Sequence, residues 1–543
     1  MTTNNNYDYV IIGGGSAGCV VAARLAEEQQ GTILLLEAGQ NAQQNPEITT
    51  TDGFKYTFSN ENTMWDRDAA KPTGTSKKPA YCGTGTGLGG SGSVNGMVYT
   101  RGDVGDFSQW PEGWRWPDIK PFFESLENRL GIQYREPTNF TEACINSALK
   151  LGFEHKNSLN DGNLRGYIGY NDMNFRGQER RSSYMSFIHG RESELPDLTV
   201  KTEVKVQRIV FDENKTATAV EVTDSGTLQT ITANKEVILC AGALETPKLL
   251  MLSGIGPREE LEKFSIPAVE YIESIGKNLQ DHPNVCIFYK TNKPIDFFYP
   301  QLYGFDRINR NTSLPEGQAD VCYTFFSVPS VIQETMKKMV PKMILPKRLH
   351  NIRPIRFGVR GLVNILFRLP PLQKFIANIY GIIVILGKPE SRGVVKLKSN
   401  NPDDQAYIDV AYYEDPTDRE TMLKAVELAH KMSEQTPLRL DWGSTLLSKA
   451  VASNDLEKIN RWLDNATMTT FHFSGTCSMG PEADKPVATD LKLKGFTNVR
   501  IADASVIPTV PVSATNAPSM LIGYRAAEFI KQESLARTSL AVN

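Results

Sequence analysis

The chain has 543 residues, of which 40% are apolar and 22% are charged, and its formal net charge is −3. This length exceeds the size at which one hydrophobic core keeps growing, so the sequence predicts two closely joined domains. The composition is that of a globular protein. It excludes a disordered chain and a nucleic-acid-binding protein with a strongly basic surface.

Seven cysteines are scattered along the chain without a CxxC pair. This pattern argues against a disulfide framework and against a structural metal site, and it predicts reduced thiols. The residues from Met1 to Tyr7 are polar and have neither the basic start nor the apolar run of a secretory signal. We therefore expect a cytoplasmic protein.

The chain opens with the pattern strand, turn, helix, strand. Tyr9 to Ile12 and Thr32 to Leu36 are apolar runs typical of buried strands, and Ser16 to Leu25 is typical of the helix between them. A strand is also expected at residues 236–240, before a second glycine turn. Strands that alternate with a helix in this way predict a parallel sheet.

Three glycines in the first turn fit the dinucleotide fingerprint. Gly13 allows a tight turn, Gly15 lets the backbone approach a pyrophosphate, and Gly18 lets the helix pack closely on the strand. Free N–H groups at the start of the helix would bind the pyrophosphate. Glu37, at the end of the second strand, is placed to accept hydrogen bonds from ribose hydroxyls and to repel a 2′-phosphate. FAD and NAD fit this pattern, whereas NADP does not.

A second glycine-rich stretch, GTGLGGSGSVNGMVYTRGDVGDFSQW, lets the backbone lie against a flat ligand. Here the chain resembles the glucose-methanol-choline (GMC) flavoenzymes, whose first signature combines paired glycines, small residues and an Asn before an aromatic residue. Gly89, Gly90, Asn95 and Tyr99 match it. Thr86 departs from it, because a basic residue, Asn or Cys is usual there.

Three later blocks continue the resemblance in the order that the family shows. GALETPKLLMLSGIG, residues 242–256, resembles the second signature, and GKNLQDHP, residues 276–283, is a further family block. Residues 498–530 resemble the last strand, the flavin-contacting turn and the final helix of the family. The matches extend over nearly the whole chain, from Tyr9 to Ile530.

The resemblance implies an α/β fold in which a Rossmann-like FAD-binding domain, discontinuous in sequence, is joined to an α+β substrate domain of a sheet with helices. We expect residues 1–100, 195–285 and 470–543 in the FAD-binding domain, and 101–194 and 286–469 in the substrate domain.

Within the substrate domain, the alternation of residues 391–399 predicts a strand and the spacing of residues 418–433 predicts a helix.

The resemblance also implies which residues contact FAD. Asp503 and Ala504 are expected near the pyrophosphate and the isoalloxazine, although Asp503 is equally typical of a residue that braces a loop. The full set of expected contacts is Gly13, Gly15, Ser16, Ala17, Gly18, Glu37, Ala38, Gly89, Gly90, Ser91, Asn95, Gly96, Met97, Val98, Val204, Ala241, Gly242, Asp503, Ala504, Asn516 and Ala517.

The block TTFHFSGTCSMG contains the candidate catalytic base, His472. Removal of a hydride from an alcohol carbon leaves a hydroxyl proton that a base must accept, and imidazole titrates near neutrality. The apolar neighbours Phe471 and Phe473 favour the neutral ring. A lone histidine is more typical of a satisfied core residue, but the family-like His-x-x-Gly-Thr-x-x-Met-Gly block favours catalysis. The histidines that lack this setting are His155, His189, His282, His350 and His430.

Asn516 is the expected partner of His472, where the family has His or Asn near the flavin N5 and the substrate hydroxyl. Asn is also a favoured N-cap, and Pro518 suits a first helical turn. The two functions are compatible, because a helix that begins there points its positive end at the flavin N1–C2=O region. Since an amide is no base, His472 would accept the proton and Asn516 would hold the hydroxyl or alkoxide.

Family members that bind FAD covalently can use a His directly before the Asn of the first signature. This chain has Val94 there. The resemblance therefore implies noncovalent FAD.

We expect an FAD-dependent alcohol dehydrogenase or oxidase that produces an aldehyde or ketone, with oxygen or a quinone as the acceptor. Relatives that are FAD-containing lyases or light-driven fatty acid decarboxylases remain an alternative, because fold does not decide function. A catalytically silent flavin-binding protein is a third possibility. Anaerobic bleaching of the flavin by an alcohol would separate them.

Residues 335–389 hold eleven Lys or Arg and no Asp or Glu among many apolar residues. Arg356, Arg360, Arg368 and the Pro370–Pro371 pair interrupt any run long enough to span a bilayer.

Such a mixture suits a surface that lies in the anionic headgroups on the inner face of a membrane. The side chains that would enter the acyl boundary are Leu362, Ile365, Leu366 and Phe367. Ordinary packing in the substrate domain with the charges in water fits equally. The membrane alternative predicts a primary, lipophilic alcohol as substrate.

Overall fold

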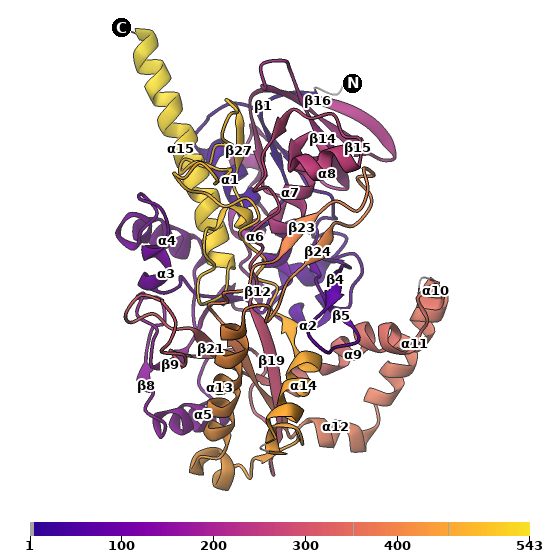
Figure 1. Cartoon of the computed structure of the whole chain (residues 1–543), viewed down its shortest axis with the longest axis vertical. Coiled ribbons are helices and arrows are strands. Elements are labelled where there is room, and N and C mark those ends of the chain that lie inside the picture. The colour runs from indigo at the N-terminus through magenta and orange to yellow at the C-terminus, as the bar shows by residue number, and fades with distance from the viewer. Residues whose placement is uncertain (1–4, 351, 454, 543) are drawn as a thin grey trace.

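The computed structural model describes residues 5–350, 352–453 and 455–542. Residues 1–4 and 543 of the expected FAD-binding domain and residue 454 of the expected substrate domain lie outside the described residues, as does residue 351 of the basic segment, which we define as residues 335–389. Two large sheets with covering helices occupy the two ends of the long axis of the molecule (Figure 1).

The first sheet has the order β13-β2-β1-β16-β15-β14, with β27 beside β16. Neighbours from β13 to β16, and the pair β16 and β27, are parallel, whereas β15 and β14 continue the sheet in antiparallel fashion. All four residues of β2 are buried, as expected for a parallel strand covered on both faces. The strands are β1 (Asn6–Ile12), β2 (Ile33–Leu36), β13 (Leu198–Lys201), β14 (Val204–Phe211), β15 (Ala217–Asp224), β16 (Thr227–Leu239) and β27 (Val499–Ile501).

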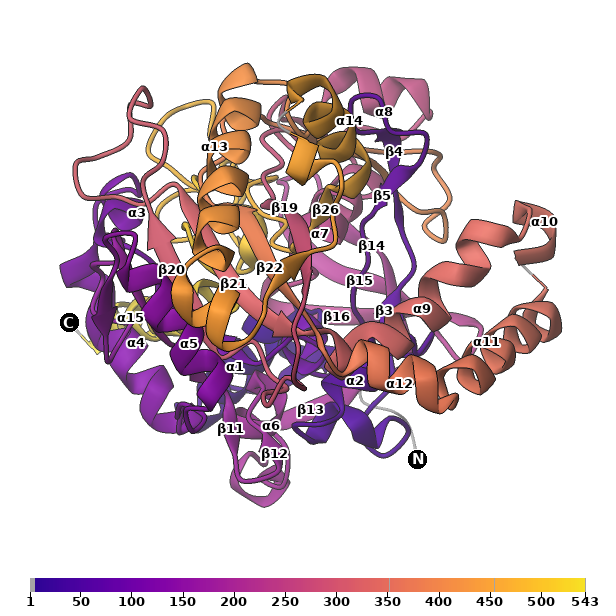
Figure 2. The same ribbon diagram turned by 90° about the horizontal axis from the view of Figure 1, so that it is seen from below.

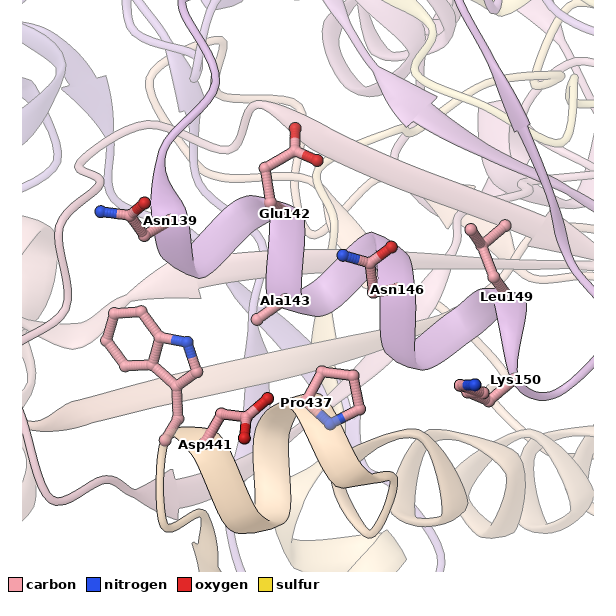
Figure 3. A pocket seen from close by; sticks show the side chains of 9 residues that line it. Asn139, Glu142, Ala143, Asn146, Leu149, Lys150, Pro437 and Asp441 are labelled. Carbon is pink, nitrogen blue, oxygen red and sulfur yellow. The ribbon is translucent and has the colours of Figure 1, made fainter.

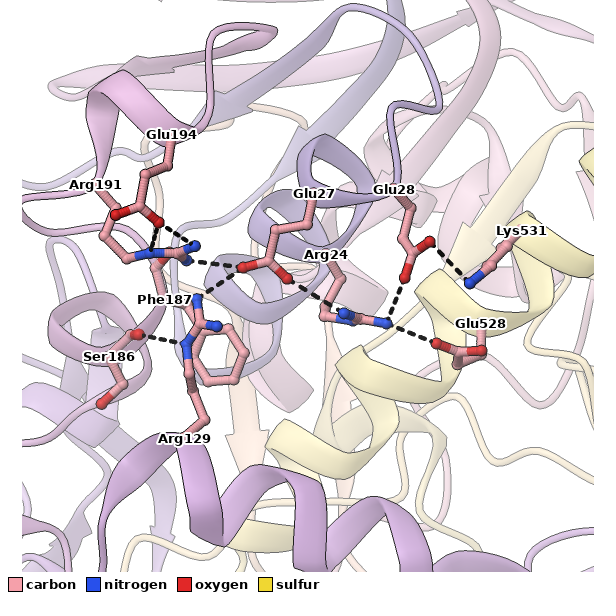
Figure 4. Close-up of polar contacts among 10 residues, drawn as sticks. All are labelled: Arg24, Glu27, Glu28, Arg129, Ser186, Phe187, Arg191, Glu194, Glu528 and Lys531. Carbon is pink, nitrogen blue, oxygen red and sulfur yellow. Dashed lines mark hydrogen bonds and ion pairs between the residues drawn. The ribbon is translucent and has the colours of Figure 1, made fainter.

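Helix α1 (Ser16–Glu27) connects β1 to β2 and packs against α15 (Asn516–Val542). Charged side chains at the end of α1 join it to its neighbours (Figure 4). Arg24 pairs with Glu528 of α15 at 2.9 Å, and Glu27 pairs with Arg129 of α4 (Trp116–Leu130) at 2.7 Å. The first and last helices of the FAD-binding region are therefore held side by side.

The second sheet has the order β25-β19-β22-β21-β20-β9-β8, with β26 beside β19. Its pairs are antiparallel except β8 with β9. Helix α13 (Pro416–Ser433), which contains the expected helix, packs against β22. The strands are β8 (Glu154–Lys156), β9 (Tyr167–Tyr170), β19 (Pro283–Lys290), β20 (Leu302–Asp306), β21 (Val321–Ser327), β22 (Ile379–Leu386), β25 (Thr445–Leu446) and β26 (Met468–Thr469).

The strand expected at residues 391–399 is shorter in the structure. Only β23 (Val394–Lys396) forms, and it pairs with β24 (Tyr407–Asp409) in a separate two-stranded sheet. The preceding Gly393 exchanges backbone hydrogen bonds with Leu279 in a loop instead of with a strand of the large sheet.

Part of the range expected in the substrate domain packs with the first sheet. Phe107, Trp114 and Phe123 are buried in the same apolar core as β1 and α15. The two sheets otherwise draw their strands from different parts of the chain, and the expected domain boundaries remain predictions.

The basic segment divides into an arm and a strand. Helices α9 (Val328–Ile344), α10 (Lys347–His350), α11 (Arg353–Phe367) and α12 (Pro370–Ile376) project from the side of the second sheet (Figures 1 and 2), and we call residues 328–376 the amphipathic arm. Residues 379–386 form the buried strand β22. This end of the basic segment is therefore inside the protein and cannot face a membrane. Among the described residues, no helix combines the length and apolarity needed to cross a bilayer.

Candidate active site

The turn between β1 and α1 has the geometry that the glycine pattern predicts. Gly13 has φ +105°, which a residue with a Cβ rarely adopts. A Cβ on Gly18 would lie 1.9 Å from the Gly13 carbonyl oxygen, so helix and strand meet too closely for any side chain. A Cβ on Gly15 would meet nothing nearer than the Cys240 carbonyl oxygen at 4.0 Å.

The start of α1 therefore has room for a ligand. Its N-cap, Gly15, gives it no side-chain hydrogen bond. Free N–H groups beside open space fit a diphosphate. Ser16 and Ala17 form the first turn of the helix.

Glu37 lies directly after β2, where the sequence predicts the ribose ligand. Its carboxylate accepts hydrogen bonds from the N–H groups of Gly14 (2.8 Å), Gly39 (2.8 Å) and Gly87 (3.0 Å). Burial raises the pKa of this carboxyl. Ala38 follows it, and the N–H of Val204 donates to the Glu37 carbonyl at 3.0 Å. One carboxylate thus joins the nucleotide turn to the second glycine stretch.

The second glycine stretch lies against the nucleotide turn. The N–H of Gly89 donates to the Gly14 carbonyl at 2.7 Å. A Cβ on Gly90 would approach the Cα of Gly15 to 2.9 Å. Residues Gly90–Ser93 form a short 3-10 helix, which includes Ser91. The expected contacts of both stretches are therefore neighbours in space.

The end of this stretch is held by a buried arginine. Asn95 accepts hydrogen bonds at Oδ1 from the Met97 N–H (2.9 Å) and from Nη1 of Arg180 (2.9 Å). Gly96 packs against Pro300, where a Cβ would come within 3.0 Å. Val98 belongs to a short strand, Val98–Tyr99, that pairs with Asp172–Met173.

Asp503 braces two strand ends in the structure. Its Oδ2 accepts hydrogen bonds from the Gly242 N–H (2.9 Å) and the Thr246 hydroxyl (2.6 Å), and its Oδ1 accepts from the Ser505 N–H (2.7 Å). The loop-bracing function that the sequence also allowed is therefore present.

The residues beside Asp503 lie at the two turns that it joins. Ala241 is the N-cap of α7 (Gly242–Leu252), and Ala504 begins the 3-10 helix Ala504–Val506. A Cβ on Gly242 would meet nothing within 4 Å, so a ligand has room there too.

His472 is half-buried and lies in the loop after β26, whose following residues, 473–480, are buried. Its backbone N–H donates to Asp281 Oδ1 at 2.7 Å, which anchors the loop. Its Nδ1 lies 2.9 Å from Nδ1 of His282, and the two rings are perpendicular. Burial lowers the pKa of His472 to about 4. The ring is therefore neutral at physiological pH and able to accept a proton.

His282 is a site residue that the sequence argument missed. Its sequence neighbours lack the setting of His472, but it is fully buried and its ring contacts His472. Burial, with His472 as a second cause, lowers its pKa well below the usual range. At this distance the two Nδ1 atoms share a hydrogen bond, in which one Nδ1 carries a proton and the other accepts the hydrogen bond. The available signal was the family block GKNLQDHP, which contains both Asp281 and His282.

Asn516 is the first residue of α15, as one of the two sequence interpretations predicts. Its Oδ1 accepts a hydrogen bond from the Ser16 hydroxyl at 2.8 Å, and a Cβ on Gly92 would lie 3.1 Å from the same oxygen. The starts of α1 and α15 therefore meet at the second glycine stretch. Ala517, next in the helix, is buried.

The loops that carry the two catalytic candidates are bonded together. The N–H of Gly475 donates to the Ala504 carbonyl at 3.1 Å, and the N–H of Cys477 donates to the Ser505 carbonyl at 2.8 Å. The segment 503–516 therefore connects the His472 loop to the start of α15.

A surface pocket lies between α5 (Asn139–Leu149) and residues 437–441 (Figure 3). It contains none of the expected site residues.

Comparison with known proteins identifies the fold. Two family models described as GMC oxidoreductase match residues 7–284 and 389–523. The chain belongs to the GMC oxidoreductase family. GMC oxidoreductases use FAD to oxidise alcohols, and this chain is an oxidoreductase that acts on CH–OH donors. The expected Rossmann-like FAD-binding domain with a second domain of sheet and helices is confirmed.

Two relatives and one solved structure illustrate the similarity. An oxygen-dependent choline dehydrogenase of Vibrio vulnificus is 30% identical over 554 residues, covering 97% of this chain and 94% of the relative. The corresponding enzyme of Photobacterium profundum is 28% identical, with 97% and 93% covered. The crystal structure of pyridoxine 4-oxidase from Mesorbium loti superposes with a TM-score of 0.81 and 25% identity, covering 96% of this chain and 98% of that one.

Proposed function

We propose that this GMC oxidoreductase oxidises a primary, lipophilic alcohol to the aldehyde, with His472 as base and Asn516 as the group that holds the substrate oxygen. The observation that carries the proposal is the contact between the Nδ1 atoms of His472 and His282 at 2.9 Å. When His472 donates its Nδ1 proton to His282, its Nε2 keeps a lone pair for the alcohol proton. His282 then acts as a positioning residue that sets the tautomer.

The remaining residues orient the reaction. Bound FAD supplies the hydride acceptor for the alcohol carbon. Asn516 offers an amide N–H₂ to the substrate oxygen while its Oδ1 is engaged by Ser16. The start of α15 adds a positive dipole end to the same region. Oxygen or a quinone is the proposed electron acceptor.

Anaerobic titration of the purified yellow protein with aliphatic, aromatic and polyol alcohols tests the reaction. We expect primary, lipophilic alcohols to bleach the flavin. No bleaching by any alcohol would overturn the proposal in favour of the lyase or photodecarboxylase alternative.

We propose that FAD is bound without a covalent bond. Val94, the residue before Asn95, has no nucleophilic atom. Acid or heat denaturation should therefore release free FAD into the supernatant. Yellow colour that remains with the precipitated polypeptide would contradict this.

We also propose that the amphipathic arm binds an anionic membrane surface on the cytoplasmic side. Its exposed apolar side chains include Phe357 (56% exposed), Leu362 (57%) and Ile365 (61%). Arg348, Arg353, Arg368 and Lys374 are exposed and form no ion pair with the described residues. Interleaved cations and apolar side chains match anionic headgroups above an acyl layer.

Two arginines of the basic segment, which the membrane alternative would place against anionic headgroups, bind a carboxylate of the protein. Arg356 is 9% exposed and pairs with Glu61 at 2.7 Å, and Arg360 pairs with the same carboxylate at 2.9 Å. These two arginines fasten α11 to the protein instead. The lipid-facing cations of the proposal are therefore the four unpaired ones.

The C-terminal part of α9 lies near the His472 loop. Lys342 of α9 lies over the Tyr81 ring at 4.4 Å, and Tyr81 contacts Phe471 with ring centroids 6.2 Å apart. Phe58 contacts both of these aromatic rings. Contacting aromatic rings thus connect α9 to Phe471, the neighbour of the proposed catalytic base, and this apolar lining supports a lipophilic substrate that arrives from the membrane.

A further inference from the structure

Arg180 is a fully buried cation at the end of the short strand Glu179–Arg180. Its guanidinium donates to the carbonyl oxygens of Gly92 (3.1 Å) and Asn95 (2.8 Å) and to Asn95 Oδ1 (2.9 Å). Its Nε has no hydrogen-bond partner. No carboxylate of the described residues pairs with it.

Other buried arginines in the described part of the chain have acidic partners. Arg500, also fully buried, pairs with Glu236 at 2.6 Å and with Glu533 at 3.0 Å. Arg101 pairs with Glu127 at 2.5 Å. A buried charge without a partner is costly, because carbonyl dipoles replace only part of its hydration. Burial accordingly lowers the pKa of Arg180 to about 9.

One backbone layer separates this charge from the expected cofactor site. Gly92, whose carbonyl accepts from Arg180, lies on the other side against the starts of α1 and α15. A Cβ on Gly92 would be 2.8 Å from the Ser16 hydroxyl and 3.1 Å from Asn516 Oδ1. Ser183, three residues after Arg180, donates its hydroxyl to the Gly15 carbonyl at 3.4 Å.

We propose that Arg180 is the fixed positive charge that balances the negative charge of bound FAD, so that it strengthens FAD binding and raises the reduction potential of the flavin. The inference rests on the FAD binding that the proposed function requires. Both the diphosphate and the reduced ring are negative. The field of Arg180 is strong because its side chain is fully buried and no carboxylate of the described residues pairs with it. The starts of α1 and α15 add dipoles of the same sign.

The experiment compares the neutral variant Arg180→Met with the charge-conserving Arg180→Lys. The midpoint potential of the bound flavin is measured by equilibration with redox dyes, which requires no alcohol substrate. The dissociation constant of FAD is measured by fluorescence titration of apoprotein. We expect Arg180→Met to lower the potential and to weaken FAD binding about tenfold, and Arg180→Lys to keep most of the potential.

Arg181→Gln is the matched control, because the adjacent Arg181 pairs with Glu179 at 2.8 Å and should affect neither quantity. An unchanged potential in folded Arg180→Met would overturn the inference and leave Arg180 as a brace for the glycine stretch. Should Arg180→Met fail to fold, the neutral but polar Arg180→Gln replaces it: a lowered potential supports the inference, and a wild-type potential overturns it. Wild-type protein that binds FAD but is not bleached by alcohols would refute the proposed reaction alone.

Discussion

The nucleotide turn and the amphipathic arm both place glycines in helices, but their surroundings are opposite. In α1, a Cβ on Gly18 would lie 1.9 Å from a backbone oxygen. In α11, Gly358 and Gly361 have nothing within 4 Å of the same position. Packing dictates the residue in the first region, whereas in the second it leaves the residue free.

The charges of the two regions differ in the same way. Glu37 is bound by three backbone N–H groups at the nucleotide turn. Arg353, Arg368 and Lys374 of the arm face water without a partner among the described residues. A satisfied buried charge organises its own structure, whereas unpaired exposed charges are available to a partner.

The largest effect is expected from Gly18→Ala. The added methyl group collides with the backbone of the turn that follows β1, and neither the central strand nor α1 can move away. We expect little or no soluble protein with bound FAD, measured as yield and as the ratio of flavin to protein absorbance. The matched control is Gly358→Ala in the arm. Full FAD content in Gly18→Ala would show that this turn is not tightly packed.

His472→Ala tests the chemistry at the first region. Loss of the base should lower kcat/KM by about 10²–10⁴-fold while FAD stays bound, and Asn516→Ala should cost less. His155→Ala, in β8, serves as the control and should retain full activity. Near-full alcohol turnover by His472→Ala at neutral pH would refute the assignment.

Charge reversal tests the arm. The triple variant Arg353→Glu, Arg368→Glu, Lys374→Glu should bind anionic vesicles at least about a hundredfold more weakly at low salt, since each cation near the surface contributes ~1 kcal/mol. Co-sedimentation measures this. A control with the same charge change elsewhere is Arg310→Glu, Lys398→Glu, Lys449→Glu. If the wild-type protein does not bind anionic vesicles at low salt, the membrane proposal for the arm is wrong.

The pH dependence of kcat/KM reports the burial of His472. Because its pKa is lowered to about 4, the ring is neutral and active above that pH and protonated below it. We expect activity to stay level through neutrality and to fall only as the pH approaches about 4. An acidic limb near the ordinary histidine value of about 6.5 would show that the ring is solvated.

The smallest effect is expected from Gly358→Ala. In the interior of a helix, alanine is more favourable than glycine by up to ~1 kcal/mol. Nothing obstructs a methyl group at position 358. We expect a slightly higher thermal stability of the arm, measured by local hydrogen exchange in α11. Faster exchange would show that this face of α11 is packed after all.

Short-range patterns in the sequence were enough to predict the nucleotide turn. The requirement for Gly13 and Gly18 arises within a single strand-turn-helix unit, so spacing alone reveals it. The start of α15 at Asn516 is local in the same sense, because Pro518 favours a first helical turn. The block around His472 is likewise a short-range pattern, and the catalytic function that it predicts stays a prediction.

Only the tertiary structure decided which charged and polar groups meet. His282 contacts a histidine 190 residues away, Arg180 binds Asn95 across 85 residues, and Arg356 binds Glu61 across 295. No periodicity or turn pattern reports such a pair. Whether a cation faces lipid, a carboxylate or a buried backbone carbonyl depends on neighbours that folding brings together from distant parts of the chain.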